Sequence, residues 1–508
     1  MMMRLRKKIV FISLLIAVTI LCSVKLYDTY AIGELENENE SFTFTLTGDT
    51  TVIVPALSSK TVLYQVKNTT DGIIKYGVGY NTDTSLDVLV YKNSPDSAEG
   101  ILAIGDNKFV KIRLENNTNS PTNVTLSTIL GYENGGDLII PSGTSLVTRI
   151  YPFPEVASVY ISSLFDSDAT ATNNSIQYKY DTNHNLMKDR FGSNTNDIDT
   201  GNIRYWGENP NNYVWFGETY KTACAEEVCG TARAAGDKKL YRIIGVFDNK
   251  LKLIQNDSIG TYSWDTSATA VYSGRGINQW GPSPQDGSGY KGADLMKLLN
   301  PGFDNNQDLD RNGNIVTVNN SLYWNSGNGN CYKGANNAIK ICDFSSTGLS
   351  SSVRSKIEEV TWYLGGVDSS LFSDQIYVME RDDNTIENPE DGVNRTTIHN
   401  GKVGLMYSSD YGYATDLRTC QSKLVAYSSA LNSYACRTND WLFTEKKQHT
   451  INPSLTKSYI QLRVATSGYI GGGNGTYDPY TTRPVFYLKS NVIFKSGSGT
   501  ETDPYLIQ

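Results

Sequence analysis

Apolar and polar residues alternate along the first part of the chain. Phe42 and Phe44 are separated by one polar residue, and the same period of two runs from Val62 through Tyr64 to Val66. Because successive side chains of a β-strand point to opposite faces, this period predicts strands that are buried on one side. Further strands are expected at 74–80, 86–91, 109–114 and 124–130.

Polar turns separate these expected strands. The segments 68–72 and 116–119 are rich in Asn and other residues that favour turns. About seven short strands at intervals of roughly 8–12 residues, with no helical period between them, are typical of an immunoglobulin-like sandwich. We therefore expect an all-β sandwich domain over 38–150. Because it carries no binding or catalytic motif, we interpret it as a spacer.

The pattern changes after residue 150. Residues 151–201 contain Pro152, Pro154 and a polar stretch rich in Asn, Asp and Thr, as expected of a linker or lead-in. Beyond this stretch the signals are mixed, with strands expected at 213–216, 240–247, 251–255 and 484–488 and helices at 292–299 and 352–364. We expect a second, α+β domain over 202–508 with long irregular loops.

The N-terminus has the layout of an export signal. Four basic side chains within the first eight residues precede an apolar run at 9–24, and a weak cleavage site ends at Ala31. As a helix, this run of about 16 residues is roughly 24 Å long, which is short for a bilayer core of about 30 Å. Residues 1–31 are therefore expected to be a cleaved signal peptide, or an N-terminal membrane anchor if they stay uncleaved.

Charge and composition narrow the classes of partner. The formal net charge is −8, and the first 31 residues carry five basic and one acidic side chain, so the remainder is more acidic still. Phosphate contacts need clustered Lys and Arg, which disfavours nucleic acid and anionic lipid as partners. A low charged fraction of 19% with abundant Gly, Asn and Tyr is typical of a loop-rich extracellular β protein. Membrane contact is expected only through 9–24.

Six of the seven cysteines lie beyond residue 220 and form three pairs of close neighbours: Cys224 and Cys229, Cys331 and Cys342, and Cys420 and Cys436. In an exported chain such a set indicates disulfides, because thiols stay reduced mainly inside cells. Six cysteines allow 15 connectivities, and the spacing favours the local one. The spacings do not fit a zinc site. Cys22 lies inside the apolar run and is interpreted as part of the signal.

One segment has the oxygen spacing of a calcium-binding loop, with Asp308, Asp310, Asn312 and Asn314 at alternate positions. Alternate side chains converge on one centre, and Gly313 permits the sharp turn that such a loop needs. Position 12 is Asn319, which lacks the usual bidentate carboxylate. The sequence therefore predicts a weak calcium site or a plain polar turn, and no other cofactor.

No catalytic motif stands out. The sequence contains no HExxH, GxSxG or GxxxxGK[ST] pattern. His184, His399 and His449 each stand alone among polar residues and are interpreted as surface histidines. Adjacent carboxylates such as Asp382 and Asp383 point to different faces and are interpreted as solvated charge. We therefore expect no enzyme activity.

Aromatic residues gather in the second domain, which holds all seven tryptophans: Trp206, Trp215, Trp264, Trp280, Trp324, Trp362 and Trp441. Exposed aromatic faces stack on sugars, and tyrosine is a common contact in binding loops. The simpler interpretation is that most of these rings fill the core of a loop-rich domain.

Eight segments carry a family resemblance: 202–207 (NIRYWG), 241–247 (YRIIGVF), 263–265 (SWD), 295–302 (LMKLLNPG), 359–366 (EVTWYLGG), 407–414 (YSSDYGYA), 483–490 (RPVFYLKS) and 497–505 (GSGTETDPY). Together they resemble an uncharacterised group of exported surface proteins of low-GC Gram-positive bacteria. The module from about 160 to 508 is distantly similar to the C-type-lectin and formylglycine-generating-enzyme fold. The resemblance implies sugar or protein binding, or rarely oxidation by a cysteine pair, and supplies no catalytic residues.

These observations favour an exported, adhesin-like binding protein at the cell surface or secreted from it. In this interpretation the sandwich spacer presents a disulfide-containing, C-type-lectin-like α+β module to a glycan or protein ligand. The alternatives are a self-assembling structural component of the envelope, and an extracellular hydrolase or modifying enzyme whose site is scattered in the sequence.

Overall fold

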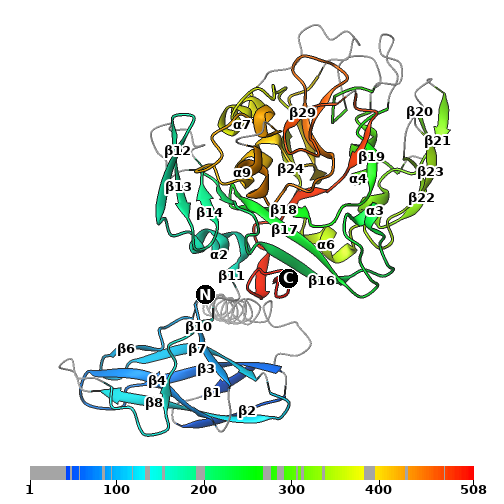
Figure 1. The fold of residues 1–508 in the computed structure, drawn as a ribbon. Helices are drawn as coiled ribbons and strands as arrows, with labels where there is room; N and C mark the ends of the chain where they lie inside the picture. Colours follow the sequence, from blue (N-terminus) through cyan, green and yellow to red (C-terminus); the bar gives the residue numbers. More distant parts are fainter. Residues whose placement is uncertain are drawn as a thin grey trace, which may run out of the picture. The chain divides into compact units, whose positions relative to one another are not determined.

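The computed structural model divides into two compact units, Met1–Pro154 and Glu155–Gln508 (Figure 1). It describes residues 42–45, 49–56, 58–82, 86–92, 94–116, 118–131, 138–151, 155–189, 201–266, 276–282, 291–304, 307–309, 314–333, 338–382, 395–428, 433–473 and 475–508. Over its described residues the first unit consists of strands, and the second combines several sheets with short helices. The expectation of a β-rich chain is confirmed.

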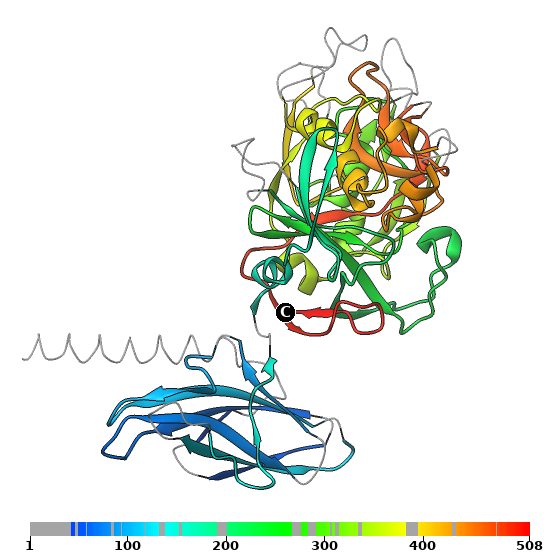
Figure 2. The ribbon, with the colours of Figure 1, turned by 60° about the vertical axis from the view of Figure 1, so that its left-hand side comes forward.

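The strands of the first unit form two sheets, seen as two layers in Figure 2. In order, one sheet contains β1 (Phe42–Thr45), β3 (Ser58–Lys67), β7 (Asn107–Asn116), β5 (Asp87–Tyr91) and β10 (Ile150–Tyr151). The other contains β2 (Thr50–Val54), β8 (Thr122–Gly131), β4 (Ile74–Thr82) and β6 (Glu99–Leu102), and β9 (Ser145–Leu146) pairs with β4.

The period of two explains the core between these sheets. Val62, Tyr64 and Val66 of β3 have no exposed surface, and they pack in one cluster with Val52 and Val54 of β2 in the other sheet. In a two-layer β fold, the side chains at alternate strand positions of both sheets point inward, and their apolar surface is thereby removed from water. The two-sheet core follows directly from the sequence pattern, whereas the immunoglobulin-like topology stays a prediction.

Two buried asparagines hold the turns that the sequence indicated. Asn68 and Asn116 are each 1% exposed. Each donates three hydrogen bonds from Nδ2 to backbone carbonyls and accepts one at Oδ1 from the backbone N–H two residues later. Asn favours turns because its side chain can satisfy backbone groups in this way.

The stretch 151–201 is not a linker over its described part. Residues from Glu155 belong to the second unit, in which they form β11 (Glu155–Val156), α2 (Ala157–Leu164), β12 (Ala169–Asn173), β13 (Ile176–Asp181) and β14 (Leu186–Lys188). Tyr178 and Tyr180 of β13 are buried at alternate positions. The abundance of Asn, Asp and Thr hid this period of two, and the expectation of a linker is therefore wrong for 155–188.

The second unit is built on a 12-stranded sheet in the order β11-β32-β33-β16-β17-β15-β14-β13-β12, in which β17 also pairs with β18, β18 with β31, and β31 with β26. The new strands are β15 (Ile203–Tyr205), β16 (Tyr213–Thr219), β17 (Lys238–Phe247), β18 (Lys250–Gln255), β26 (Val403–Gly404), β31 (Val485–Tyr487), β32 (Ile493–Ser496) and β33 (Tyr505–Ile507). Strand β33 lies parallel to β16, so residues near 506 and residues near 215 are neighbours in this sheet.

A five-stranded sheet and three two-stranded ladders complete the second unit. The sheet has the order β19 (Thr261–Ser263), β30 (Pro479–Thr481), β27 (Gln448–Pro453), β28 (Gln461–Val464) and β29 (Ile470–Gly472). The ladders are β20 (Gln307–Leu309) with β21 (Ile315–Thr317), β22 (Asn328–Tyr332) with β23 (Ile339–Asp343), and β24 (Val360–Tyr363) with β25 (Ile398–Gly401).

The helices are short: α3 (Glu226–Cys229), α4 (Asp294–Leu299), α5 (Leu322–Asn325), α6 (Ser351–Lys356), α7 (Ser373–Arg381), α8 (Ser408–Ala414) and α9 (Ser433–Thr438). The helix expected over 352–364 is wrong in its second half, because α6 ends at Lys356 and β24 follows. Val360 and Thr361 are β-branched and pair with β25. Trp362 of β24 is fully buried.

A buried network of charges joins three distant parts of the second unit. Arg204 of β15 bonds through Nη1 to Oδ1 of Asp410 in α8 at 3.1 Å, and through Nε to Asp189. Lys252 of β18 bonds to the other oxygen of Asp410. Burial alone would raise the pKa of Asp410, but Lys252 and Arg204 hold it below its ordinary value. The carboxylate therefore stays charged between two cations.

We predict that Asp410→Asn lowers the free energy of unfolding of the second unit by about 3–5 kcal/mol, because two buried cations lose their shared counter-charge. All seven tryptophans lie after residue 200, so tryptophan fluorescence during urea unfolding of the full chain reports on this unit. The control is Glu359→Gln, which removes an exposed ion pair with Lys402 and should cost less than about 1 kcal/mol. Equal effects of both variants would contradict a central role for the network.

Candidate functional site

The six cysteines form three disulfides: Cys224–Cys229, Cys331–Cys342 and Cys420–Cys436. Each joins neighbours in the sequence, as the spacing favoured. The Cα–Cα distances of 4.9–6.0 Å are ordinary for disulfides. The presence of disulfides is thereby confirmed and indicates an oxidising environment.

Only part of the segment with the spacing of a calcium-binding loop lies within the described residues. Asp308 lies in β20 and Asn314 directly precedes β21, so the segment spans the tip of a β-hairpin. Asp310 and Asn312 lie outside the described residues. Within the described ranges, no three His, Cys, Asp or Glu side chains come together to hold a metal ion. Calcium binding by this loop stays a prediction.

Most of the tryptophans are core residues, as the simpler interpretation held. Trp264, Trp280 and Trp362 are essentially inaccessible, with at most 1% exposure. Trp215 and Trp324 are half-buried. The three inaccessible rings therefore cannot serve as an exposed aromatic platform for a ligand.

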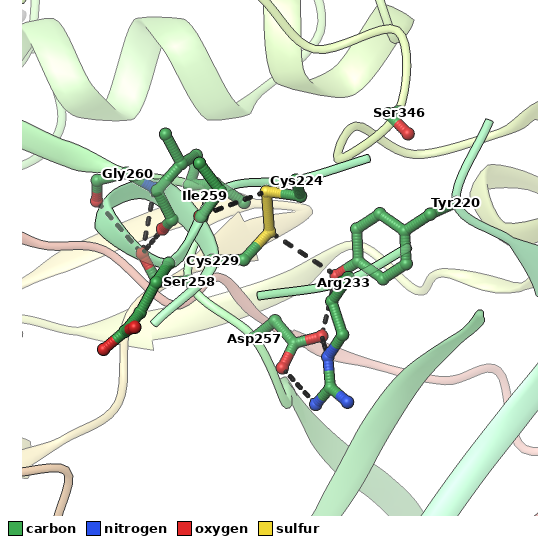
Figure 3. Close-up of a disulfide and its surroundings, with 12 residues drawn as sticks. Tyr220, Cys224, Cys229, Arg233, Asp257, Ser258, Ile259, Gly260 and Ser346 are labelled. Atoms are coloured by element: carbon green, nitrogen blue, oxygen red, sulfur yellow. Dashed lines mark hydrogen bonds and ion pairs between the residues drawn. A yellow bond between two sulfur atoms is a disulfide. The ribbon is translucent and has the colours of Figure 1, made fainter. Parts of the chain in front are cut away.

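A cavity of about 260 Å³ lies beside the Cys224–Cys229 disulfide. Its wall comes from regions far apart in the sequence: residues 229–231 of the disulfide loop, Arg242 of β17, residues 256–258 after β18, and Trp441, Thr444, Lys446, Thr481 and Arg483. Figure 3 shows the disulfide with the neighbouring Asp257 and Ser258 of this wall. We consider this cavity, called the arginine pocket below, the candidate functional site.

Hydrogen bonds fix the disulfide loop against the wall of the arginine pocket. Asp257 accepts two bonds from Arg233, at 2.9 and 2.7 Å, and one from the Tyr220 hydroxyl at 2.8 Å (Figure 3). Burial and the Asp257 carboxylate raise the pKa of Tyr220, which therefore stays a donor. The Ser258 hydroxyl bonds to the carbonyl of Val228 and accepts from Gly260 N–H. Asp257 is thus neutralised by Arg233 and unavailable as a free carboxylate.

Arg242 is held by neutral groups. Its Nε donates to Oδ1 of Asn212 at 2.7 Å, and its Nη2 donates to Oδ1 of Asn209 and to the carbonyl of Pro210. The guanidinium carbon lies 4.2 Å from the ring centre of Tyr213 and 4.5 Å from that of Trp441. These rings favour a cation without cancelling its charge.

Arg483 is the second buried cation of the pocket. It is 4% exposed, and its Nε donates to the carbonyl of Gln255 at 3.0 Å. Its Nη1 is buried with no hydrogen-bond partner among the described residues. Burial, together with Arg242, lowers the pKa of Arg483 to about 10, and burial lowers that of Arg242 to about 10. Both side chains therefore remain charged at neutral pH.

Asp440 is the remaining acidic group that acts on Arg483. It is buried, its Oδ1 accepts from Leu442 N–H, and burial raises its pKa well above the ordinary value. Neither Asp440 nor any other carboxylate in the described part of the chain forms an ion pair with Arg483 or Arg242. The arginine pocket therefore contains two guanidinium groups that form no ion pair, although Asp257, Asp440 and Glu501 lie near enough to act on their charge.

No motif in the sequence predicted this pocket. Arg242 and Arg483 stood out only as members of segments that carry the family resemblance. The wall of the pocket combines residues more than 200 positions apart in the sequence, so no local spacing of residues predicts the pocket. One hint to the pocket was available. Strand β17 is buried over nine of its ten positions and yet contains an arginine.

Comparisons with known proteins give no assignment. No known protein family and no curated protein matches the chain. Among solved structures, the periplasmic inhibitor of g-type lysozyme PliG from Aeromonas hydrophila aligns with 18% of this chain and 98% of its own, at 8% identity and a TM-score of 0.10. A similarity of this size carries no argument about fold or function.

Across the described residues, we find no helix that combines the length and the apolar character needed to cross a membrane. The apolar run at 9–24 lies outside the described part of the chain.

His449 contradicts the expectation of surface histidines. It is 1% exposed on β27, with Nε2 at 2.7 Å from the Tyr262 carbonyl and Nδ1 at 3.0 Å from Nε2 of Gln461. Nε2 therefore donates and Nδ1 accepts, an arrangement that only the neutral ring allows. Burial lowers the pKa of His449 to about 4. It does not line the arginine pocket.

We predict that His449 makes the second unit lose stability in mild acid. An unfolded histidine takes up its proton near pH 6.5, whereas the folded one resists until about pH 4, so falling pH favours the unfolded state. The free energy of unfolding of the wild type should fall by about 2–3 kcal/mol more than that of His449→Gln between pH 7 and pH 4.5. Urea unfolding at each pH measures this, and parallel profiles would show that His449 titrates normally.

Proposed function

We propose that this protein is an exported binding protein whose second unit holds a glycan ligand in the arginine pocket. In this proposal the first unit is an immunoglobulin-like spacer, and the second unit is the C-type-lectin-like module that contacts the ligand. The three disulfides support an oxidising location outside the cytoplasm. The proposal includes no chemical step on the ligand.

The composition of the arginine pocket is the observation that carries this proposal. Its wall combines two charged guanidinium groups with the hydroxyl-bearing Thr231, Thr444 and Thr481. Ligand sites place a few polar groups in a concave wall to fix the orientation of what they bind. Hydroxyl and guanidinium groups suit the dense hydrogen-bonding surface of a sugar.

The wall of the pocket is suited to holding rather than to proton transfer. Arg242 and Arg483 remain protonated at neutral pH, so neither acts as a general base. Asp257 is occupied by Arg233 and Tyr220. The fixed positions of these groups reduce the entropy lost on binding, which favours affinity.

We predict that Thr231→Trp strongly weakens glycan binding. Thr231 is exposed and lines the pocket, so a large ring there should block entry without disturbing the core. The full-length protein is tested on a glycan array, and hits are quantified by surface plasmon resonance; binding should weaken at least about tenfold.

The matched control is Ala232→Trp, an exposed neighbour that does not line the pocket. It should bind like the wild type, and both variants should unfold at the wild-type temperature. An array without hits, or glycan binding that survives Thr231→Trp unchanged, would refute the proposal.

A further inference from the structure

We infer that the arginine pocket recognises the carboxylate of an acidic sugar, which lies against Arg483 and Arg242. This inference rests on the proposed function and adds the chemical class of the ligand. The charges of the wall, the free donor of Arg483, and the size and polarity of the cavity support it.

The first argument is the charge of the wall. Burying a cation is costly unless a counter-charge accompanies it. The buried network elsewhere in this unit obeys that rule, because Asp410 and Asp189 face Arg204 and Lys252. In the described part of the chain, no carboxylate forms an ion pair with Arg242 or Arg483, and Asp257, Asp440 and Glu501 act on them only from beyond contact distance. An anion from outside the protein would supply the missing charge.

The second argument is the free donor of Arg483. The side chain is 96% buried, its Nε is occupied by the Gln255 carbonyl, and its buried Nη1 has no acceptor among the described residues. A buried donor without an acceptor costs about 1–3 kcal/mol, and more when it is charged. Arg483 lines the cavity, so a carboxylate bound there would lie beside this incompletely paired guanidinium. Guanidinium and carboxylate form the strongest class of protein hydrogen bonds.

The third argument concerns the rest of the ligand. A cavity of about 260 Å³ is just below the usual range of about 300–1,000 Å³ for small-molecule sites, so it suits one ring-sized unit. The hydroxyl-bearing wall residues Thr231, Thr444 and Thr481 match the hydroxyls of a sugar ring. A lone inorganic ion would leave most of this space and these groups unused.

The fourth argument is rigidity. Tyr213 and Trp441 enclose the Arg242 guanidinium, and three hydrogen bonds fix it. The part of the wall near Cys229 and Asp257 is tied by the Cys224–Cys229 disulfide and by the bonds from Arg233 to Asp257. The half-buried Lys446 adds a further positive charge to the wall. The cations are thus held in place before the anion arrives, as a preorganised site requires.

The test is calorimetric titration of the full-length protein at low salt with sodium glucuronate, glucose, sodium acetate and the dipeptide Asp-Ala. Glucuronate should bind at least about tenfold more tightly than glucose, which lacks the charge, and than acetate, which lacks the ring. Because the attraction is between charges, 0.5 M NaCl should weaken binding of glucuronate severalfold.

Variants locate the carboxylate. Arg483→Gln should weaken glucuronate binding by about 10- to 100-fold, the usual effect of losing a charged hydrogen bond. The matched control is Arg463→Gln, which changes another buried arginine that does not line the pocket and should leave binding intact. If Arg483→Gln fails to fold, Lys446→Glu reverses a half-buried charge of the wall and should weaken binding severalfold.

The outcomes separate this inference from the proposed function. Glucose that binds as tightly as glucuronate, and is lost in Thr231→Trp, would overturn the inference and leave a glycan-binding protein. Acetate or Asp-Ala that binds as tightly as glucuronate would overturn the acidic sugar and show an anion or peptide site instead. Absence of binding by all four probes, or glucuronate binding unaffected by Arg483→Gln and Lys446→Glu, would also overturn it.

Discussion

The second unit depends on one buried carboxylate, Asp410, which lies between Arg204 and Lys252. These three residues come from α8, β15 and β18, elements that are brought together only by folding of the whole unit. Each partner is essentially without solvent contact, so none tolerates the loss of the others. The network thereby fixes the helix to the central sheet, and with it the strands that carry the arginine pocket.

Two buried arginines of the same sheet differ in the groups that surround their positive charge. Arg204 and Arg242 lie on the neighbouring strands β15 and β17, both nearly inaccessible. The first is matched by carboxylates of the protein, whereas the second is matched only by amide oxygens, a carbonyl and aromatic rings. Natural cores avoid the second arrangement unless it serves a purpose, since it costs stability. The carboxylate proposed for the ligand would give Arg242 the contact with a counter-charge that Arg204 receives from the protein itself.

Local patterns in the sequence predicted much of the fold but little of the candidate site. Val62, Tyr64 and Val66 occupy alternate positions in the sequence and are all buried. Alternate side chains of a strand point to the same face, so this burial could be predicted from the sequence alone. The helix expected over 352–364 was wrong in its second half, because a strand partner at β25 outweighed the helical spacing. Arg242 and Arg483 meet only through the fold, so no spacing along the chain could pair them.

The three disulfides have a consequence for how the chain matures. Partners are separated by 5, 11 and 16 positions, and each cysteine has its own partner as its nearest cysteine along the chain. Short loops close with less entropy loss than long ones. Oxidation of the emerging chain would therefore find the correct partners by proximity alone, before any sheet has formed. Such a protein has little need of an isomerase to reshuffle mispaired sulfurs, and its cross-links can precede its tertiary fold.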